Sequence, residues 1–155
     1  TFFGMLYVAG SFGTLLALRE MKNAEIIIAI FISIWICDSA AYFGGRAFGK
    51  HKLFERVSPN KTWEGAIAGF LGTMVGVLAL YNTLLNSYSI KELLIIVISV
   101  GVFGQIGDLF ESLLKRDANI KDSSTIIPGH GGVLDRFDSL LFVAPIMYMY
   151  FKFIS

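Results

Sequence analysis

Two groups of oxygen-bearing side chains are spaced so that each group can act together. Asp108, Glu111 and Ser112 stand three and four positions apart, which places them on one face of a helix. Asp135 and Asp138 form a second group, three positions apart. Carboxylates brought from two helices to the same depth can share a hard divalent cation. Because the sequence has no Cys/His cluster, Mg²⁺ is a better candidate than zinc for such a cation.

A basic segment and a glycine-rich turn lie between these two groups. Lys115, Arg116 and Lys121 come first, and His130, Gly131 and Gly132 follow. Lysine and arginine can neutralise phosphate oxygens, and a glycine turn lets backbone N–H groups approach an anion. The turn alone is a weak signal, and a single loop histidine is more often a polar surface residue than a catalyst. In combination, the acids, bases and glycine turn predict phosphoryl or nucleotidyl transfer.

A second basic segment, between residues 44 and 65, repeats this chemistry. Arg46, Lys50 and Lys61 are candidate substrate-binding residues within a glycine-punctuated run. The alternative for any one of these lysines is that it only sets the orientation of the protein in the membrane and is attracted to anionic lipids. Lys121 and Arg116 have a comparable alternative, since each flanks an aspartate and could form a local, solvated ion pair worth ~0–1 kcal/mol.

The composition predicts the elements that must position these residues. Of the 155 residues, 55% are hydrophobic and 16% are charged, which excludes a disordered chain, a disulfide scaffold and most soluble enzymes. A net charge of +1 argues against a nucleic-acid partner. Helices that cross a bilayer need about 20 mostly apolar residues. Five such stretches can be marked: 2–18, 26–45, 65–85, 93–114 and 137–151. We therefore predict an all-α, polytopic integral membrane protein with about five transmembrane helices.

Charge asymmetry predicts the orientation of these helices. The two segments richest in Lys and Arg lie between the second and third stretches and between the fourth and fifth, so the positive-inside rule places both loops in the cytoplasm. Glycines 65, 69, 72 and 76 recur every three or four residues, which favours a tight helix pair over ordinary glycine enrichment. With no repeat and no linker, residues 1–155 are predicted to form a single transmembrane catalytic domain.

Three acids lie within the second and fourth apolar stretches: Asp38, Asp108 and Glu111. An aspartate at a helix centre costs ~2.5–3.5 kcal/mol on insertion scales, so these acids need partners, water or a metal. One interpretation is that they are solvated near the cytoplasmic interface. The other is a functional role, either in the transfer chemistry above or in the ion path of an ion-coupled transporter.

The run from Ser112 to Asp138 resembles the signature of the phosphatidate cytidylyltransferases, the CDP-diacylglycerol synthases. The matching positions include Lys115-Arg116, Lys121-Asp122, Pro128, His130-Gly131-Gly132 and Asp135-Arg136-Phe137-Asp138. Residues 38–50 and 58–65 are similar to upstream segments of the same family. Members of that family usually have several more membrane helices before this region, so the resemblance implies a C-terminal catalytic portion without them.

The resemblance implies transfer of CMP from CTP to phosphatidate, giving CDP-diacylglycerol and pyrophosphate. It implies an integral, homodimeric enzyme of the cell (inner) membrane, with its active site facing the cytoplasm. It also implies Mg²⁺, with a second cation such as K⁺ as an option. Asp108 and Asp135 would hold the metal, with Asp138 in support. Lys115, Arg116, Lys121 and Arg136 would neutralise phosphate charge. A second interpretation is a related CTP-dependent enzyme that acts on another lipid phosphate or a polyprenol. The sequence does not separate the two, because no sequence pattern specifies which lipid chain a pocket binds.

Overall fold

The computed structural model describes residues 2–118, 120, 132 and 134–154, and side chains from residue 4 onward. Predicted His130, Gly131 and Lys121 lie outside the described residues. In chain order the elements are α1 (Phe2–Met21), α2 (Ala24–Phe48), β1 (Lys52–Phe54), β2 (Ser58–Thr62), α3 (Trp63–Leu80), α4 (Ile90–Ile98), the π-helix η1 (Ser99–Gly104), α5 (Gln105–Asp117) and α6 (Leu134–Phe153).

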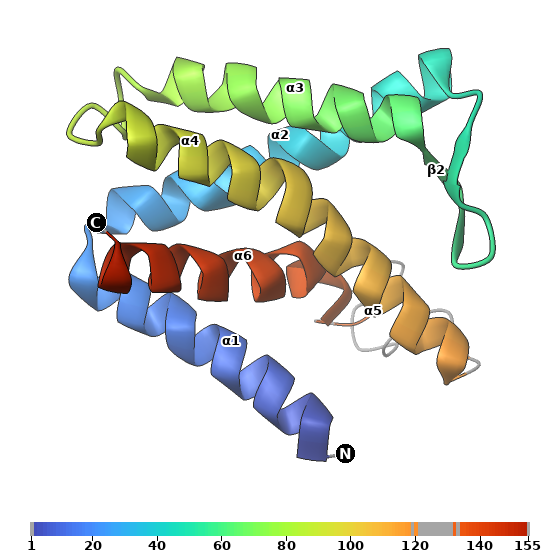
Figure 1. Cartoon of the computed structure of the whole chain (residues 1–155), viewed down its shortest axis with the longest axis horizontal. Helices are drawn as coiled ribbons and strands as arrows, with labels where there is room; N and C mark the ends of the chain where they lie inside the picture. Colours follow the sequence, from blue (N-terminus) through green and yellow to red (C-terminus); the bar gives the residue numbers. More distant parts are fainter. Residues whose placement is uncertain (1, 119, 121–131, 133, 155) are drawn as a thin grey trace.

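All five apolar stretches form helices, as predicted (Figure 1). Three of these helices are long and apolar enough to cross a membrane: residues 24–48, 63–80 and the continuous helix 90–117. α1 and α6 are each 20 residues long but do not meet the same combined criterion of length, hydropathy and charge. The prediction of an all-α polytopic membrane protein is confirmed. The short antiparallel hairpin β1–β2 was not predicted.

α2 and α3 pack closely because small residues line their contact. A Cβ added at Gly72 would stand 2.5 Å from the Ala40 Cβ, and one at Gly69 would stand 3.1 Å from the Cys37 carbonyl oxygen. Gly76 faces Ile36 in the same way. The glycine spacing therefore marks a helix–helix contact, as predicted, and this contact holds the end of α2 beside the start of α3.

The parts of the two basic segments that the structure describes lie at one end of the helix bundle. In Figure 1 the end of α2, the hairpin, the start of α3, the end of α5 and the start of α6 all lie on the right. At the opposite end, the Lys22 Nζ lies 3.5 Å from the Glu92 Oε1 and 4.4 Å from the centre of the Phe151 ring. These contacts connect the α1–α2 junction to α4 and α6 at the end remote from the hairpin.

The best-packed residues lie between the helices, and large apolar side chains also cover the outside. Ile30, Ile96 and Met147 are fully buried, from α2, α4 and α6. On α3, by contrast, Val75 and Leu78 are more than half exposed. A helix with apolar side chains on every face suits a lipid environment, because both its packed and its outer surface avoid water.

Candidate active site

The hairpin is held in place by local hydrogen bonds that the sequence specifies. The Thr62 hydroxyl accepts from the Gly65 N–H at 3.1 Å and so caps the start of α3. The Trp63 N–H donates to the His51 carbonyl at 3.0 Å, and the His51 Nδ1 lies 2.6 Å from the Glu64 Oε1. These bonds fix the two strands relative to α3, so side chains of β2 project over the end of the bundle.

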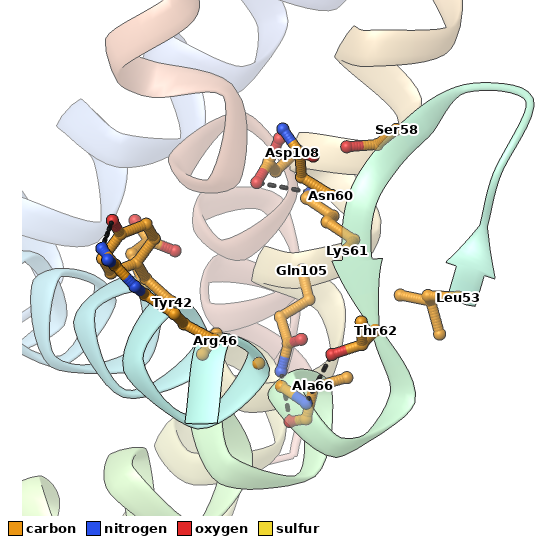
Figure 2. Close-up of a pocket in the computed structure, with 14 residues that line it drawn as sticks. Tyr42, Arg46, Leu53, Ser58, Asn60, Lys61, Thr62, Ala66, Gln105 and Asp108 are labelled. Carbon is orange, nitrogen blue, oxygen red and sulfur yellow. Dashed lines mark hydrogen bonds and ion pairs between the residues drawn. The ribbon is translucent and has the colours of Figure 1, made fainter. Parts of the chain in front are cut away.

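A cavity of about 500 Å³, here the hairpin cavity, lies between the hairpin and the helices (Figure 2). Its polar walls come from Tyr42 and Arg46 on α2, Asn60 and Lys61 on β2, and Gln105 on α5. Two further acids, Asp38 and Asp108, also line it. The Arg46 guanidinium donates to the Tyr42 hydroxyl at 3.2 Å, so these two side chains are held together at the cavity wall.

A second cavity of about 760 Å³, here the acidic cavity, lies between α2, α5 and the start of α6. Four carboxylates line it, together with two cations and a wall of apolar side chains. Its charged residues are Asp38, Asp108, Lys115, Asp135, Arg136 and Asp138. Asp38 and Asp108 line both cavities, so the two cavities adjoin at these two carboxylates.

An ion pair crosses this junction. The Lys61 Nζ lies 2.5 Å from the Asp108 Oδ2 and joins the hairpin to α5. The Lys61 and Asp108 side chains keep 27% and 33% of their surface exposed, but the Lys61 Nζ itself is buried against Asp108. Asp38 forms no hydrogen bond or ion pair with any described residue, which leaves an unpaired carboxylate at the same junction. Such an acid on a membrane-spanning helix indicates a functional site.

Lys115 holds the far side of the acidic cavity together. Its Nζ lies 2.7 Å from the Asp135 Oδ1 and 3.1 Å from the Glu111 Oε2. The Asp135 Oδ2 also accepts from the Gly132 N–H at 2.6 Å. Glu111 is only 2% exposed and lines neither cavity, although the helical spacing placed it beside Asp108. Its carboxylate is therefore buried behind Lys115.

The structure brings most of the predicted site residues to one end of the bundle, but not all of them to the cavities. Arg46, Lys61, Asp108, Lys115, Asp135, Arg136 and Asp138 line one or both cavities. Lys50 is exposed and Ser112 half-buried, and neither lines a cavity. Arg116 is exposed, and its Nε donates to the Val57 carbonyl at 3.4 Å instead of pairing with Asp117.

The residues of the acidic cavity fit a hard cation by donor type. Asp38, Asp108, Asp135 and Asp138 all present carboxylate oxygens to this cavity, which are the ligands that Mg²⁺ takes. Among the residues that the structure describes, no three His, Cys, Asp or Glu side chains are gathered closely enough to ligate one ion. Lys61 and Lys115 contact two of these aspartates instead. The metal site stays a prediction.

Sequence reasoning missed several residues that line the cavities. Asp38 was singled out as an intramembrane acid but given no place in the site, and Tyr42, Asn60 and Gln105 were not selected at all. Neutral polar residues carry little signal in a sequence. The sequence signal that could have indicated Gln105 is its position three residues before Asp108, which puts both residues on one helix face.

The fold and the cavities define a polytopic membrane protein with an acidic and basic site at one end of its helix bundle. A family profile described as the cytidylyltransferase family matches residues 1–154, and the chain belongs to this family. A phosphatidate cytidylyltransferase of Haemophilus influenzae is 45% identical over 83% of the chain and 46% of its own length. One of Bacillus subtilis is 43% identical over 92% of the chain and 54% of its own length. The chain thus spans about half the length of these relatives.

Proposed function

We propose that this chain transfers CMP from CTP to phosphatidate, giving CDP-diacylglycerol and pyrophosphate in phospholipid biosynthesis. The names of the relatives support this activity. The observation that carries it is the junction of two cavities at Asp38 and Asp108, with cations on both sides. Two substrates held in adjoining cavities would meet beside charged groups, which is what a group transfer between phosphates requires.

The chemistry assigns roles to the residues at this junction. An oxygen of the lipid phosphate attacks the α-phosphorus of CTP. The bond from that phosphorus to the oxygen bridging to the β-phosphorus breaks, and pyrophosphate leaves with the bonding electrons. Lys61, Lys115 and Arg136 would stabilise the negative charge that develops on the leaving group. The lipid phosphate is already ionised near neutral pH, so the site needs no strong base.

Mg²⁺, a second cation such as K⁺, and a homodimer belong to the same proposal. Asp108 and Asp135 would hold Mg²⁺, with Asp138 in support, because all three present oxygen ligands to the acidic cavity. When bound, Mg²⁺ would neutralise phosphate charge. The metal would also offset the excess of acids over bases in that cavity, which would otherwise repel both substrates.

Pyrophosphate release tests the function directly. The protein in lipid nanodiscs is supplied with CTP, UTP, ATP or GTP, each with and without phosphatidate. We expect release only with CTP and phosphatidate together, and CDP-diacylglycerol as the lipid product. Release that needs a polyprenol phosphate instead would favour another acceptor. Ion uptake without any release would favour the transporter.

We propose that the hairpin end of the bundle faces the cytoplasm. The motivation is the excess of basic residues in the segments at that end. With the native Cys37 replaced by serine, we expect Lys52→Cys in intact cells to react only with thiol reagents that cross the membrane. Lys91→Cys, exposed near the opposite end, serves as the matched control and should react with impermeant reagents. The reverse pattern would invert the topology.

A further inference from the structure

We propose that Gln105 is the residue that recognises the cytosine base, by accepting a hydrogen bond from its exocyclic amine. This inference rests on the proposed function, because it assigns the hairpin cavity to the nucleotide. The amide of Gln105 lines that cavity near Lys61 and Asp108 (Figure 2). A side-chain amide has both donors and an acceptor, so its value for recognition depends on which of them faces the ligand.

Two backbone carbonyls fix the orientation of this amide. The Gln105 Nε2 donates to the Gly101 carbonyl at 2.6 Å and to the Ala66 carbonyl at 3.1 Å. Carbonyl oxygens only accept, so exchanging the amide nitrogen and oxygen would set oxygen against oxygen at both contacts. The nitrogen therefore stays on the side of Ala66, as drawn in Figure 2.

The helix backbone makes these two contacts available. Gly101 belongs to the π-helix η1, whose wider turn directly precedes Gln105. A Cβ at Gly101 would stand 2.8 Å from the Phe70 ring, so the absence of a side chain lets η1 lie against α3. Ala66 lies one turn before Phe70 on α3, which brings its carbonyl within reach of the amide. Both N–H groups are thus used to connect the two helices.

The remaining polar atom, the Oε1, is left as an oriented acceptor. Within the described residues the nitrogen makes both of these bonds to carbonyls, and the other hydrogen-bonding neighbour of the amide is the thiol of Cys37. A thiol is a weak donor and an amide oxygen has two lone pairs, so the oxygen can still accept from a ligand. Gln105 lies three residues before Asp108, about 4.5 Å along the helix axis, so a base at Gln105 would place its phosphates toward Asp108 and Lys61. The ring of Tyr42, more than half exposed, offers the same cavity a stacking surface.

This acceptor distinguishes cytosine from uracil. Cytosine carries an amine at position 4, whereas uracil carries a carbonyl oxygen at that position. The Gln105 Oε1 would accept a hydrogen bond from the amine of cytosine and repel the carbonyl oxygen of uracil. Uracil could be accommodated only by turning the amide, which would lose both bonds to the backbone carbonyls. We expect this one contact to favour CTP over UTP by about 10- to 100-fold.

The test compares kcat/KM for CTP and UTP in the protein and in Gln105→Met, which keeps the side-chain length but removes the amide. We expect the CTP preference to fall by about 10- to 100-fold, mainly through loss of activity with CTP. A purely structural role would lower both values equally and leave the ratio unchanged. Asn60→Ala is the matched control, because it removes an amide from the same cavity that no backbone carbonyl of a described residue orients. Its ratio should not change.

Two further measurements keep the inference testable if Gln105→Met folds poorly or transfer fails. The unaltered protein should use a CTP analogue without the 4-amino group about 10- to 100-fold less well than CTP. Equilibrium binding of CTP and UTP without any lipid should show the same preference. Selective binding of CTP over UTP without CMP transfer would contradict the proposed function and support this inference. Two results would overturn the role of Gln105. One is CMP transfer in which the analogue without the 4-amino group is used as well as CTP. The other is a ratio of kcat/KM for CTP and UTP that Asn60→Ala alters and Gln105→Met does not.

Discussion

Asp108→Asn is expected to lower the rate of CMP transfer by ~10³-fold or more while leaving the protein folded. Asp108 lies at the junction of both cavities and pairs with Lys61 at 2.5 Å. The amide keeps the shape of the side chain but removes the charge, so it would lose both a proposed metal ligand and the partner that positions Lys61. The pair is partly exposed and the asparagine oxygen can still accept a hydrogen bond from Lys61, so the unfolding temperature should change little.

Asp117→Asn is the matched control for this variant. Asp117 ends the same helix and is exposed, but it lines neither cavity. Its substitution makes the same change of charge outside the proposed site, and its rate should stay near that of the unaltered protein. Near-normal transfer by Asp108→Asn in Mg²⁺ would show that Asp108 is not a metal ligand and that the junction is not the reaction centre.

Lys115→Met is expected to lower both stability and activity. Its ammonium group lies between Glu111 and Asp135, whose side chains are 2% and 13% exposed. Removing one partner of a buried charge pair costs ~3–5 kcal/mol, because the remaining charges lose their compensation in a poorly solvated place. We expect an unfolding temperature about 10 °C lower, measured by thermal denaturation in detergent. Transfer should be lost as well, since a cation also disappears from the acidic cavity.

A double variant separates these two effects. In Lys115→Met with Glu111→Gln, the most buried carboxylate is neutralised together with its partner, so much of the lost stability should return. Activity should not return, because no cation replaces Lys115 at the acidic cavity. If the single variant is as stable as the unaltered protein, the ion pairs do not contribute to the fold. If the double variant regains transfer, Lys115 is structural and takes no part in the chemistry.

The helices themselves could be predicted because their signals are local. Apolar runs of about 20 residues, the glycines at 65, 69, 72 and 76, and the clustering of Lys and Arg all act through neighbours along one chain segment. The carboxylates at 108, 135 and 138 could be selected for a related reason. An acid in or beside an apolar run needs a partner or a function wherever the rest of the chain lies.

Which side chains face one another depended on the tertiary structure, because contacts between helices have no local signal. Glu111 shares a helix face with Asp108 by spacing, yet packing against α6 buries it behind Lys115 and outside both cavities. Asp38 and Lys61 reach Asp108 only because the glycine face draws α3, and the hairpin before it, against α2. Gln105 becomes an oriented acceptor because Ala66, 39 residues earlier, presents a carbonyl to its amide. Backbone carbonyls are the same in every residue type, so only the packed helices determine which of them that amide meets.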